Sequence, residues 1–176
     1  MQAEETKLKG CFIIKPQVFP DNRGYFFESF NQQKFEAATG QSGSFVQDNQ
    51  SASSYGVVRG LHFQKAEHAQ AKLVRAIEGK VLDVAVDIRE GSPTYGEWVA
   101  VELTAENNFQ LYIPRGFAHG FSVLSETAIF AYKCDNFYNK SAEGGIKYND
   151  PLLNINWQIP VDTMSLSEKD LQLPYL

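Results

Sequence analysis

The chain has 176 residues and a formal net charge of −5, with 43% hydrophobic and 21% charged residues. This length suits one domain with a buried core, and the acidic balance disfavours a protein that binds nucleic acid mainly through charge. No apolar run approaches the roughly 20 residues of a membrane span, and the polar N-terminus has no apolar signal core, so a cytoplasmic protein without a membrane partner is expected.

Short hydrophobic runs broken by Gly, Pro, Asn and Asp recur along the chain and predict strands. Residues 10–18 predict the first strand, a turn follows at 20–24, and residues 25–30 predict the second strand. Residues 31–39 are the best helix candidate, with Gly40 as its C-cap. Further strands are predicted over residues 45–49, 56–64, 71–78, 80–89, 98–103, 109–113, 120–124 and 128–134.

The tail is mixed: residues 154–157 are expected to be extended, and residues 165–170 to begin a short helix. Many strands so close together, with little helix between them, favour a sandwich or barrel over repeating βαβ units. The 13% of aromatic residues suits the pleated faces of sheets. Because the chain has no internal repeat or linker, residues 1–176 are predicted to form one compact β domain.

Two of the three histidines lie in segments that suit contact with an anionic ligand. His62 lies in the segment RGLHFQ, and His119 lies in IPRGFAHGF. In both segments glycine lets the backbone approach a ligand closely, while Arg59 or Arg115 supplies a planar guanidinium that suits phosphate or carboxylate. Together with Lys72, these cations favour a functional role over the commoner alternative of a structural or exposed histidine.

The same spacing bears on metal binding. The pattern PxGxxH that ends at His119 resembles the second metal-binding motif of cupins, which are small double-stranded β-helix barrels. Metal-holding cupins usually supply an HxH pair from the first motif, whereas the matching segment here reads HFQ from His62. Two histidines are too few for the usual three protein ligands, and Cys11 and Cys134 are expected to be buried, reduced thiols. A cupin without a metal or other cofactor is therefore expected.

Several longer blocks resemble the dTDP-4-dehydrorhamnose 3,5-epimerase family, in the right order and without large gaps. They are FPDNRGYFFESF (19–30), QDNQSASSYGVVRGLHFQ (47–64), QAKLVRAIEGKVLDVAVDIREGSPTYG (70–96), IPRGFAHGFSVLS (113–125), AYKCDNFYNKSAEGGIKYND (131–150) and SLSEKD (165–170). The resemblance implies an all-β, cupin-type jelly-roll barrel with short peripheral helices. It also implies an isomerase that inverts C3 and C5 of a dTDP-linked 4-keto-6-deoxyglucose on the way to dTDP-L-rhamnose.

The resemblance assigns catalytic roles to four residues. Epimerisation beside a ketone needs a base, stabilisation of the enolate, and an acid on the opposite face. His62 matches the base, because imidazole titrates near neutral pH, and Asp170 matches the carboxylate that orients it. Lys72 matches the cation beside the keto oxygen and Tyr132 the acid. Without the resemblance, each of these residues has a purely structural interpretation. Asp170 would be a charge at the start of a helix or on the surface, Lys72 a solvated strand residue, and Tyr132 a core tyrosine.

The resemblance also implies how a dTDP-sugar is held. Arg59 and His119 match residues that bind the diphosphate, and Arg23 matches one that contacts the nucleotide, because guanidinium groups suit phosphate oxygens. Tyr138 matches a tyrosine that stacks on thymine. The remaining positions at which the family contacts its ligand are Gln47, Asp48 and Asn49, which offer polar groups, and Glu28, Lys72, Glu143 and Lys169.

By the same resemblance the chain is expected to form a homodimer. Strands within residues 8–30 would lie at the interface, and Arg23 and Glu28 would serve the partner's ligand.

Three alternative functions stay open: a related enzyme that inverts a single centre, a non-catalytic sugar-binding cupin, and a metal-dependent cupin oxygenase or isomerase. Tyr132 favours double inversion, because its phenol could return a proton on the face opposite His62.

Overall fold

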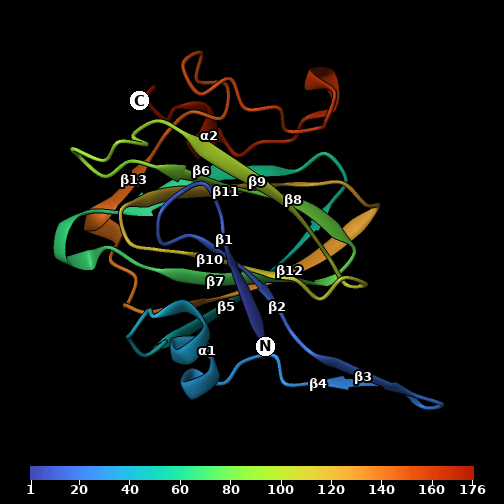
Figure 1. The fold of residues 1–176 in the computed structure, drawn as a ribbon. Coiled ribbons are helices and arrows are strands. Elements are labelled where there is room, and N and C mark those ends of the chain that lie inside the picture. The colour runs from blue at the N-terminus through green and yellow to red at the C-terminus, as the bar shows by residue number, and fades with distance from the viewer.

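The computed structural model describes residues 1–176 and consists of two β-sheets packed face to face, with a separate hairpin (Figure 1). The larger sheet has the order β1 (Gln2–Glu5), β2 (Phe12–Lys15), β10 (Gln110–Ile113), β7 (Lys72–Glu78), β12 (Thr127–Cys134) and β5 (Gln47–Ser54). The smaller sheet has the order β13 (Glu143–Gly145), β6 (Val58–Gln64), β11 (Phe117–Val123), β8 (Lys80–Asp87) and β9 (Trp98–Thr104).

The remaining elements are short and lie around this barrel. The hairpin is formed by β3 (Val18–Asp21) and β4 (Gly24–Phe27), and the helices are α1 (Gln32–Thr39) and α2 (Glu168–Leu171). Single 3-10 turns occur at η1 (Ala66–His68), η2 (Lys140–Ala142) and η3 (Val161–Thr163). All named strand pairs are antiparallel. The predicted jelly-roll barrel with peripheral helices is confirmed.

The main core lies between the two sheets. Its 14 buried residues include Val74, Val81, Phe121 and Phe130, which come from β7, β8, β11 and β12. Fully burying an aliphatic or aromatic side chain of this kind contributes roughly 1.5–3 kcal/mol, so this layer is a major source of stability. Cys11 also lies in this core and is a free thiol, as predicted.

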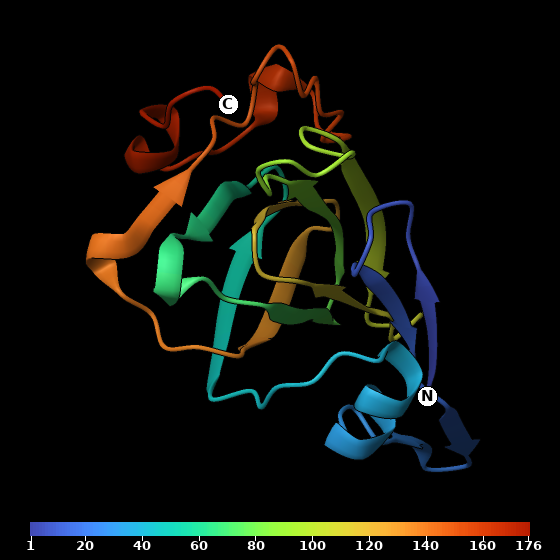
Figure 2. The ribbon, with the colours of Figure 1, turned by 60° about the vertical axis from the view of Figure 1, so that its left-hand side comes forward.

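The outer faces of both sheets are covered as well, one by α1 and the other by the tail (Figures 1 and 2). Phe35 of α1 packs beside Leu73 and Tyr112 on the larger sheet. Trp157 of the tail packs with Val84 on the smaller sheet. This double covering explains why every residue of β11 and nearly every residue of β8 is buried.

The predicted helix is confirmed, together with its caps. Asn31 is the N-cap, whose side chain accepts a hydrogen bond from the backbone N–H of Lys34. Gly40 closes the helix with a φ of 67°, in the left-handed region that glycine adopts without strain.

One predicted strand is wrong. Residues 10–18 form no single strand, because Pro16 lacks an N–H; β2 ends at Lys15 and β3 begins at Val18, then runs through Pro20 into the predicted turn. Residues 154–157, which were expected to be extended, belong to no strand and cross the outer face of the smaller sheet. No helix is long and apolar enough to cross a membrane.

Candidate active site

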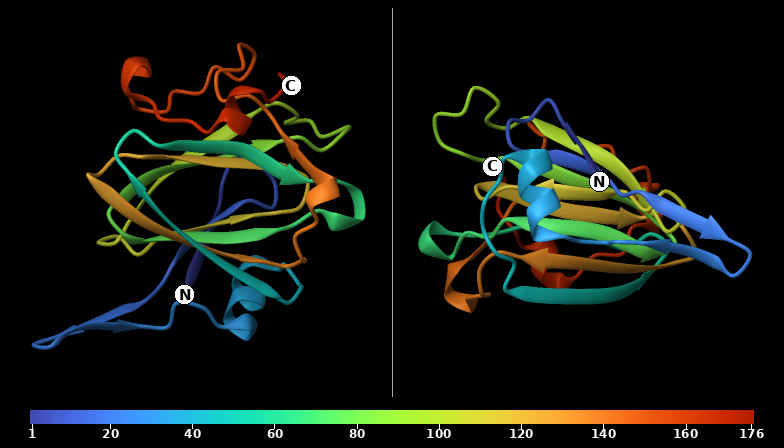
Figure 3. Two further views of the ribbon diagram at one scale, coloured as in Figure 1. Left: turned by 180° about the vertical axis from the view of Figure 1, so that it is seen from behind. Right: turned by 60° about the horizontal axis from the view of Figure 1, so that its bottom comes forward.

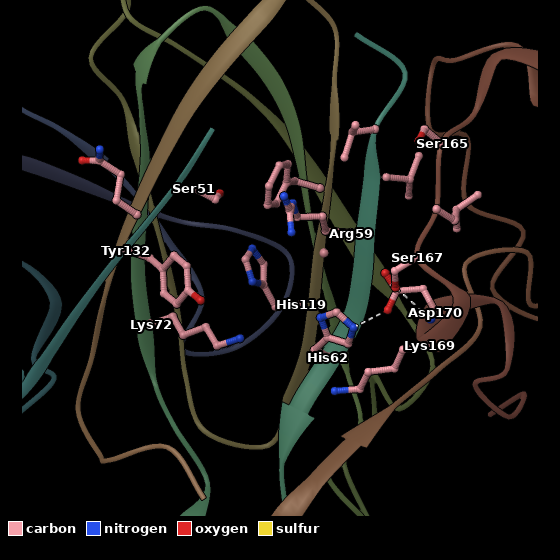
Figure 4. A pocket seen from close by; sticks show the side chains of 16 residues that line it. Ser51, Arg59, His62, Lys72, His119, Tyr132, Ser165, Ser167, Lys169 and Asp170 are labelled. Atoms are coloured by element: carbon pink, nitrogen blue, oxygen red, sulfur yellow. Dashed lines mark hydrogen bonds and ion pairs between the residues drawn. The ribbon is translucent and has the colours of Figure 1, made fainter. Parts of the chain in front are cut away.

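A cavity of about 470 Å³ opens inside the barrel, between the two sheets and the tail (Figure 4). A second cavity of about 310 Å³ adjoins it and shares four of its lining residues. Together the two cavities hold most of the predicted site residues: Gln47, Asn49, Arg59, His62, Lys72, His119, Tyr132, Tyr138, Glu143, Lys169 and Asp170.

On one wall, His62 of β6 is paired with Asp170 of α2. Its Nε2 lies 2.6 Å from Oδ1 of Asp170, and the chain brings these residues together across 108 positions. Asp170 is buried, whereas 40% of the His62 side chain is exposed to the cavity. Ser167, the N-cap of α2, accepts a hydrogen bond from the backbone N–H of Asp170 at 3.1 Å and so fixes the turn.

The charge of Asp170 follows from these contacts. Burial by itself raises the pKa of its carboxyl group, but hydrogen bonds from His62, Ser167 and the backbone of Gly60 outweigh burial and hold the pKa below its usual range. An ionised Asp170 accepts only, so Nε2 of His62 holds a proton and Nδ1 is left as the basic nitrogen. This is the arrangement of a histidine general base with its orienting carboxylate.

Glycines place this histidine beside a second one. A Cβ on Gly60 would lie 2.7 Å from Cα of Gly120, and a Cβ on Gly120 would lie 2.6 Å from the carbonyl oxygen of Arg59. Both residues must therefore be glycine for β6 and β11 to approach so closely. In that register His62 is the direct cross-strand partner of His119, so both rings face the same cavity.

The opposite wall holds Lys72 of β7 and Tyr132 of β12. Nζ of Lys72 lies 5.8 Å from the centre of the Tyr132 ring, and both polar ends point to the middle of the cavity (Figure 4). Lys72 forms no ion pair, and burial lowers its pKa, against opposing effects of Cys134 and Asp83. Burial raises the pKa of Tyr132, which keeps its phenol protonated as a hydrogen-bond or proton donor.

His119 is more deeply placed than its predicted diphosphate contact implies. It is only 6% exposed, stacks on Phe130 with ring centres 6.2 Å apart, and its Nε2 lies 2.8 Å from Oδ2 of Asp83. Burial lowers its pKa, against the opposing effect of Asp83. The sequence analysis did not predict a role for Asp83. The feature that could have indicated one is its position as a single acidic residue in the apolar run VLDVAV.

The adjoining cavity has a polar rim. Lys169 pairs with Glu143 at 2.7 Å, and Tyr138 is 51% exposed with its backbone N–H donating to Oε1 of Gln47 at 3.0 Å. Arg59 lines the first cavity, and its guanidinium donates twice to Oγ of Ser53, at 3.2 Å each. An exposed aromatic face beside several charged and amide groups suits a flat, polar ring with an anionic substituent.

Some predicted residues lie elsewhere. Arg23 pairs with Asp21 at the tip of the hairpin, and Glu28 pairs with Lys34, both outside the two cavities. Asp48 pairs with Lys133 in a third cavity, which shares Tyr132 with the other two. The expectation that Arg115 adds charge beside His119 is wrong, because its guanidinium pairs with Asp135 at 2.8 Å and the residue lines neither cavity. No group of three or more His, Cys, Asp or Glu side chains is placed to hold a metal ion.

Known proteins match this chain along almost its full length. The family model for dTDP-4-dehydrorhamnose 3,5-epimerase matches residues 5–176. The enzyme of that name from Shigella flexneri is 54% identical over 171 residues, which are 97% of this chain and 93% of the relative.

Solved structures of the same family match this chain as well. The dTDP-4-dehydrorhamnose 3,5-epimerase of Elizabethkingia anophelis is 61% identical with a TM-score of 0.96, over 100% of this chain and 96% of that one. The dTDP-6-deoxy-D-glucose-3,5-epimerase of Legionella pneumophila, in complex with dTDP-4-keto-L-rhamnose, is 47% identical with a TM-score of 0.95, over 99% and 92%. The chain therefore belongs to the dTDP-4-dehydrorhamnose 3,5-epimerase family.

Proposed function

We propose that this chain converts dTDP-4-dehydro-6-deoxy-α-D-glucose to dTDP-4-dehydro-β-L-rhamnose by inverting C3 and C5. The observation that supports this most is the opposition of two walls in one cavity, with His62 and Asp170 on one side and Lys72 and Tyr132 on the other. Inversion beside a ketone requires groups on both faces of the sugar ring, and this arrangement supplies them.

In this proposal His62 begins each inversion. Its Nδ1 removes the proton from the carbon beside the ketone, and the electron pair of the broken C–H bond moves into an enolate with its negative charge on the C4 oxygen. Lys72 stabilises that oxygen through charge and hydrogen bonding. The phenol of Tyr132 then returns a proton to the carbon from the opposite face as the enolate reverts to the ketone. Solvent restores the proton of the phenol, and His62 releases to solvent the proton that it removed. The same sequence at the second carbon completes the reaction.

The nucleotide part occupies the adjoining cavity in this proposal. Tyr138 stacks on thymine, Gln47 and Asn49 bind its polar edge, and Arg59 binds the diphosphate at the mouth. The Legionella pneumophila relative was solved in complex with dTDP-4-keto-L-rhamnose, which supports a nucleotide sugar as the ligand.

The hairpin supports a homodimer. It projects from the barrel and exposes Phe19, Tyr25 and Phe26 by 52, 59 and 70% (Figure 3). Such an apolar surface on a projecting element is typical of an interface, and a partner's hairpin would bring Arg23 to the nucleotide.

Sedimentation velocity should give the mass of a dimer, and replacing Phe26 by Ser should shift the distribution toward monomer. A monomer at micromolar concentration for the unaltered chain would contradict the assembly.

Proton NMR in deuterated water, with a metal chelator present, tests the reaction itself. Incubation with the 4-keto sugar should place deuterium at both C3 and C5 and give the L-lyxo product. The His62→Ala variant should lose most exchange while still binding dTDP. Exchange at C3 alone would indicate a single-centre enzyme, and activity that disappears with the chelator would indicate a metal-dependent one. A chain that binds dTDP without exchange at either carbon would be a binding protein.

A further inference from the structure

Asp83 is a buried acidic side chain beside the cavity that the proposed mechanism leaves unused. It is 0% exposed in β8, and its Oδ2 meets Nε2 of His119 at 2.8 Å. Its other oxygen, Oδ1, is buried with no hydrogen-bond partner. Neither arginine nor lysine pairs with it, so His119 is the only polar side chain in direct contact with it.

This contact fixes which nitrogen of His119 holds a proton. A carboxylate accepts hydrogen bonds and donates none, so Nε2 of His119 donates to Asp83. Four elements face this ring: Asp83 comes from β8, Lys72 from β7, His62 from β6 and Phe130 from β12. Burial and the two nearby basic groups favour the neutral imidazole over the cation. Nδ1 then has a lone pair, and no protein donor lies within hydrogen-bond distance of it.

A lone pair at Nδ1 does not suit a diphosphate. Phosphate oxygens near neutral pH are acceptors, and two acceptors form no hydrogen bond. A sugar hydroxyl group, in contrast, donates a hydrogen bond to such an acceptor at little electrostatic cost.

We propose that the Asp83–His119 pair is a hydrogen-bond acceptor for a ring hydroxyl of the hexose, with Asp83 as the positioning residue and His119 as the contact that gives specificity for that hydroxyl. This inference rests on the proposed function. His119 is the cross-strand partner of His62, and such partners lie about 4.5–5.5 Å apart, so the group it binds lies next to the carbon that His62 deprotonates. The candidates are therefore the hydroxyl groups at C2 and C3.

The variant Asp83→Asn tests the positioning role. Its amide can donate to Nε2, which moves the imidazole proton to Nδ1 and turns the acceptor into a donor. Long-range ¹H–¹⁵N NMR should show protonated Nε2 in the unaltered enzyme and protonated Nδ1 in the variant. The affinity for dTDP should stay within about 2-fold, while kcat/KM for the full substrate falls by about 10- to 100-fold. A dTDP affinity that changes 10-fold or more would place His119 at the diphosphate and overturn the proposal.

Sugars that lack one hydroxyl group test the specificity. Deuterium exchange at C5 can be followed for the 2-deoxy and 3-deoxy forms of the 4-keto nucleotide sugar. The unaltered enzyme should disfavour one of them by about 10- to 100-fold in kcat/KM, and His119→Phe should abolish that preference. Phenylalanine keeps the stacking on Phe130. Equal rates for the full and both deoxy substrates in the unaltered enzyme would refute the assignment.

Ser122→Ala is the matched control. Ser122 is buried in the same strand as His119 but faces the tail, where its Oγ donates to the carbonyl of Trp157 at 2.7 Å. This variant should lower the melting temperature without changing the preference between substrates. If Asp83→Asn fails to fold, His119→Phe with the deoxy substrates still decides the question. Absence of exchange in the unaltered enzyme would refute the proposed reaction, whereas the NMR and dTDP results would still test the pair.

Discussion

One oxygen atom distinguishes Tyr132 from phenylalanine, and that atom is assigned the second half of each inversion. Tyr132→Phe should leave proton removal by His62 intact, because the pair with Asp170 lies on the other wall. Solvent deuterium should still enter the substrate, but formation of the inverted product should fall by about 10²–10⁴-fold, the usual contribution of a positioned acid. Comparing deuterium uptake with product formation by NMR separates the two steps. A normal rate of inversion would show that another group is the acid.

The exposed ring of Tyr138 has a different task. Tyr138→Ala should weaken dTDP binding by about 1–3 kcal/mol, the usual value of base stacking, with a smaller effect on kcat. Titration calorimetry with dTDP measures this directly. Tyr95 is an equally exposed tyrosine, at 50%, that lines neither substrate cavity, so Tyr95→Ala is the control. Equal losses in both variants would contradict the stacking role.

At the scale of elements, the approach of β6 to β11 sets the position of both histidines. Gly120→Ala would place a methyl group 2.6 Å from the carbonyl oxygen of Arg59, so one strand must move. Overpacking of this kind costs about 1–3 kcal/mol, and the movement should displace His62 from Asp170. We expect a lower melting temperature and a loss of kcat larger than the loss of dTDP affinity. Unchanged turnover would show that the strands tolerate the shift.

The sequence predicted some strands more accurately than others. Strands with strong apolar patterns, such as β7, β8 and β12, were predicted close to their observed bounds. Strand β1 has the sequence QAEE and β13 has EGG, and neither was predicted because edge strands facing solvent need no apolar pattern. For the same reason β5, with the sequence QDNQSASS, was predicted too short.

Within the site, some contacts between residues could be predicted from the sequence and others could not. His62 and Asp170 come together as the family pattern implies, although no local feature of the sequence joins positions 108 apart. Asp83 was missed because its importance depends on which strand lies beside β8. Arg23 and Glu28 lie outside the cavities of their own chain, and their predicted roles depend on a second subunit.

For the whole molecule, Asp87 connects the barrel to the loop after β8. Its carboxylate accepts hydrogen bonds from Arg89, Ser92 and Thr94 at 2.6–2.9 Å. Burial alone raises the pKa of Asp87, but these bonds outweigh burial and hold the pKa well below its usual range. The folded state therefore binds this proton more weakly than the unfolded state, in which the pKa is about 3.9.

Asp87→Asn should consequently reduce the free energy of unfolding by about 1–3 kcal/mol above pH 5. The stability that Asp87 provides is lost as pH falls below about 4 and through the folded pKa, so the difference between variant and unaltered chain should shrink in acid. Urea unfolding from pH 3 to pH 7 measures it. A difference that stays constant over this range would mean that the charge of Asp87 contributes nothing.

The contact between His62 and Asp170 also has a kinetic consequence. Asp170 reaches the cavity only when the tail has crossed the outer face of the smaller sheet and α2 has settled against β6. Sheets can form before that step, but the general base is then without its orienting carboxylate. We therefore expect turnover to return on refolding no earlier than the docking of the tail, and the circular-dichroism signal of the strands to recover no later than turnover.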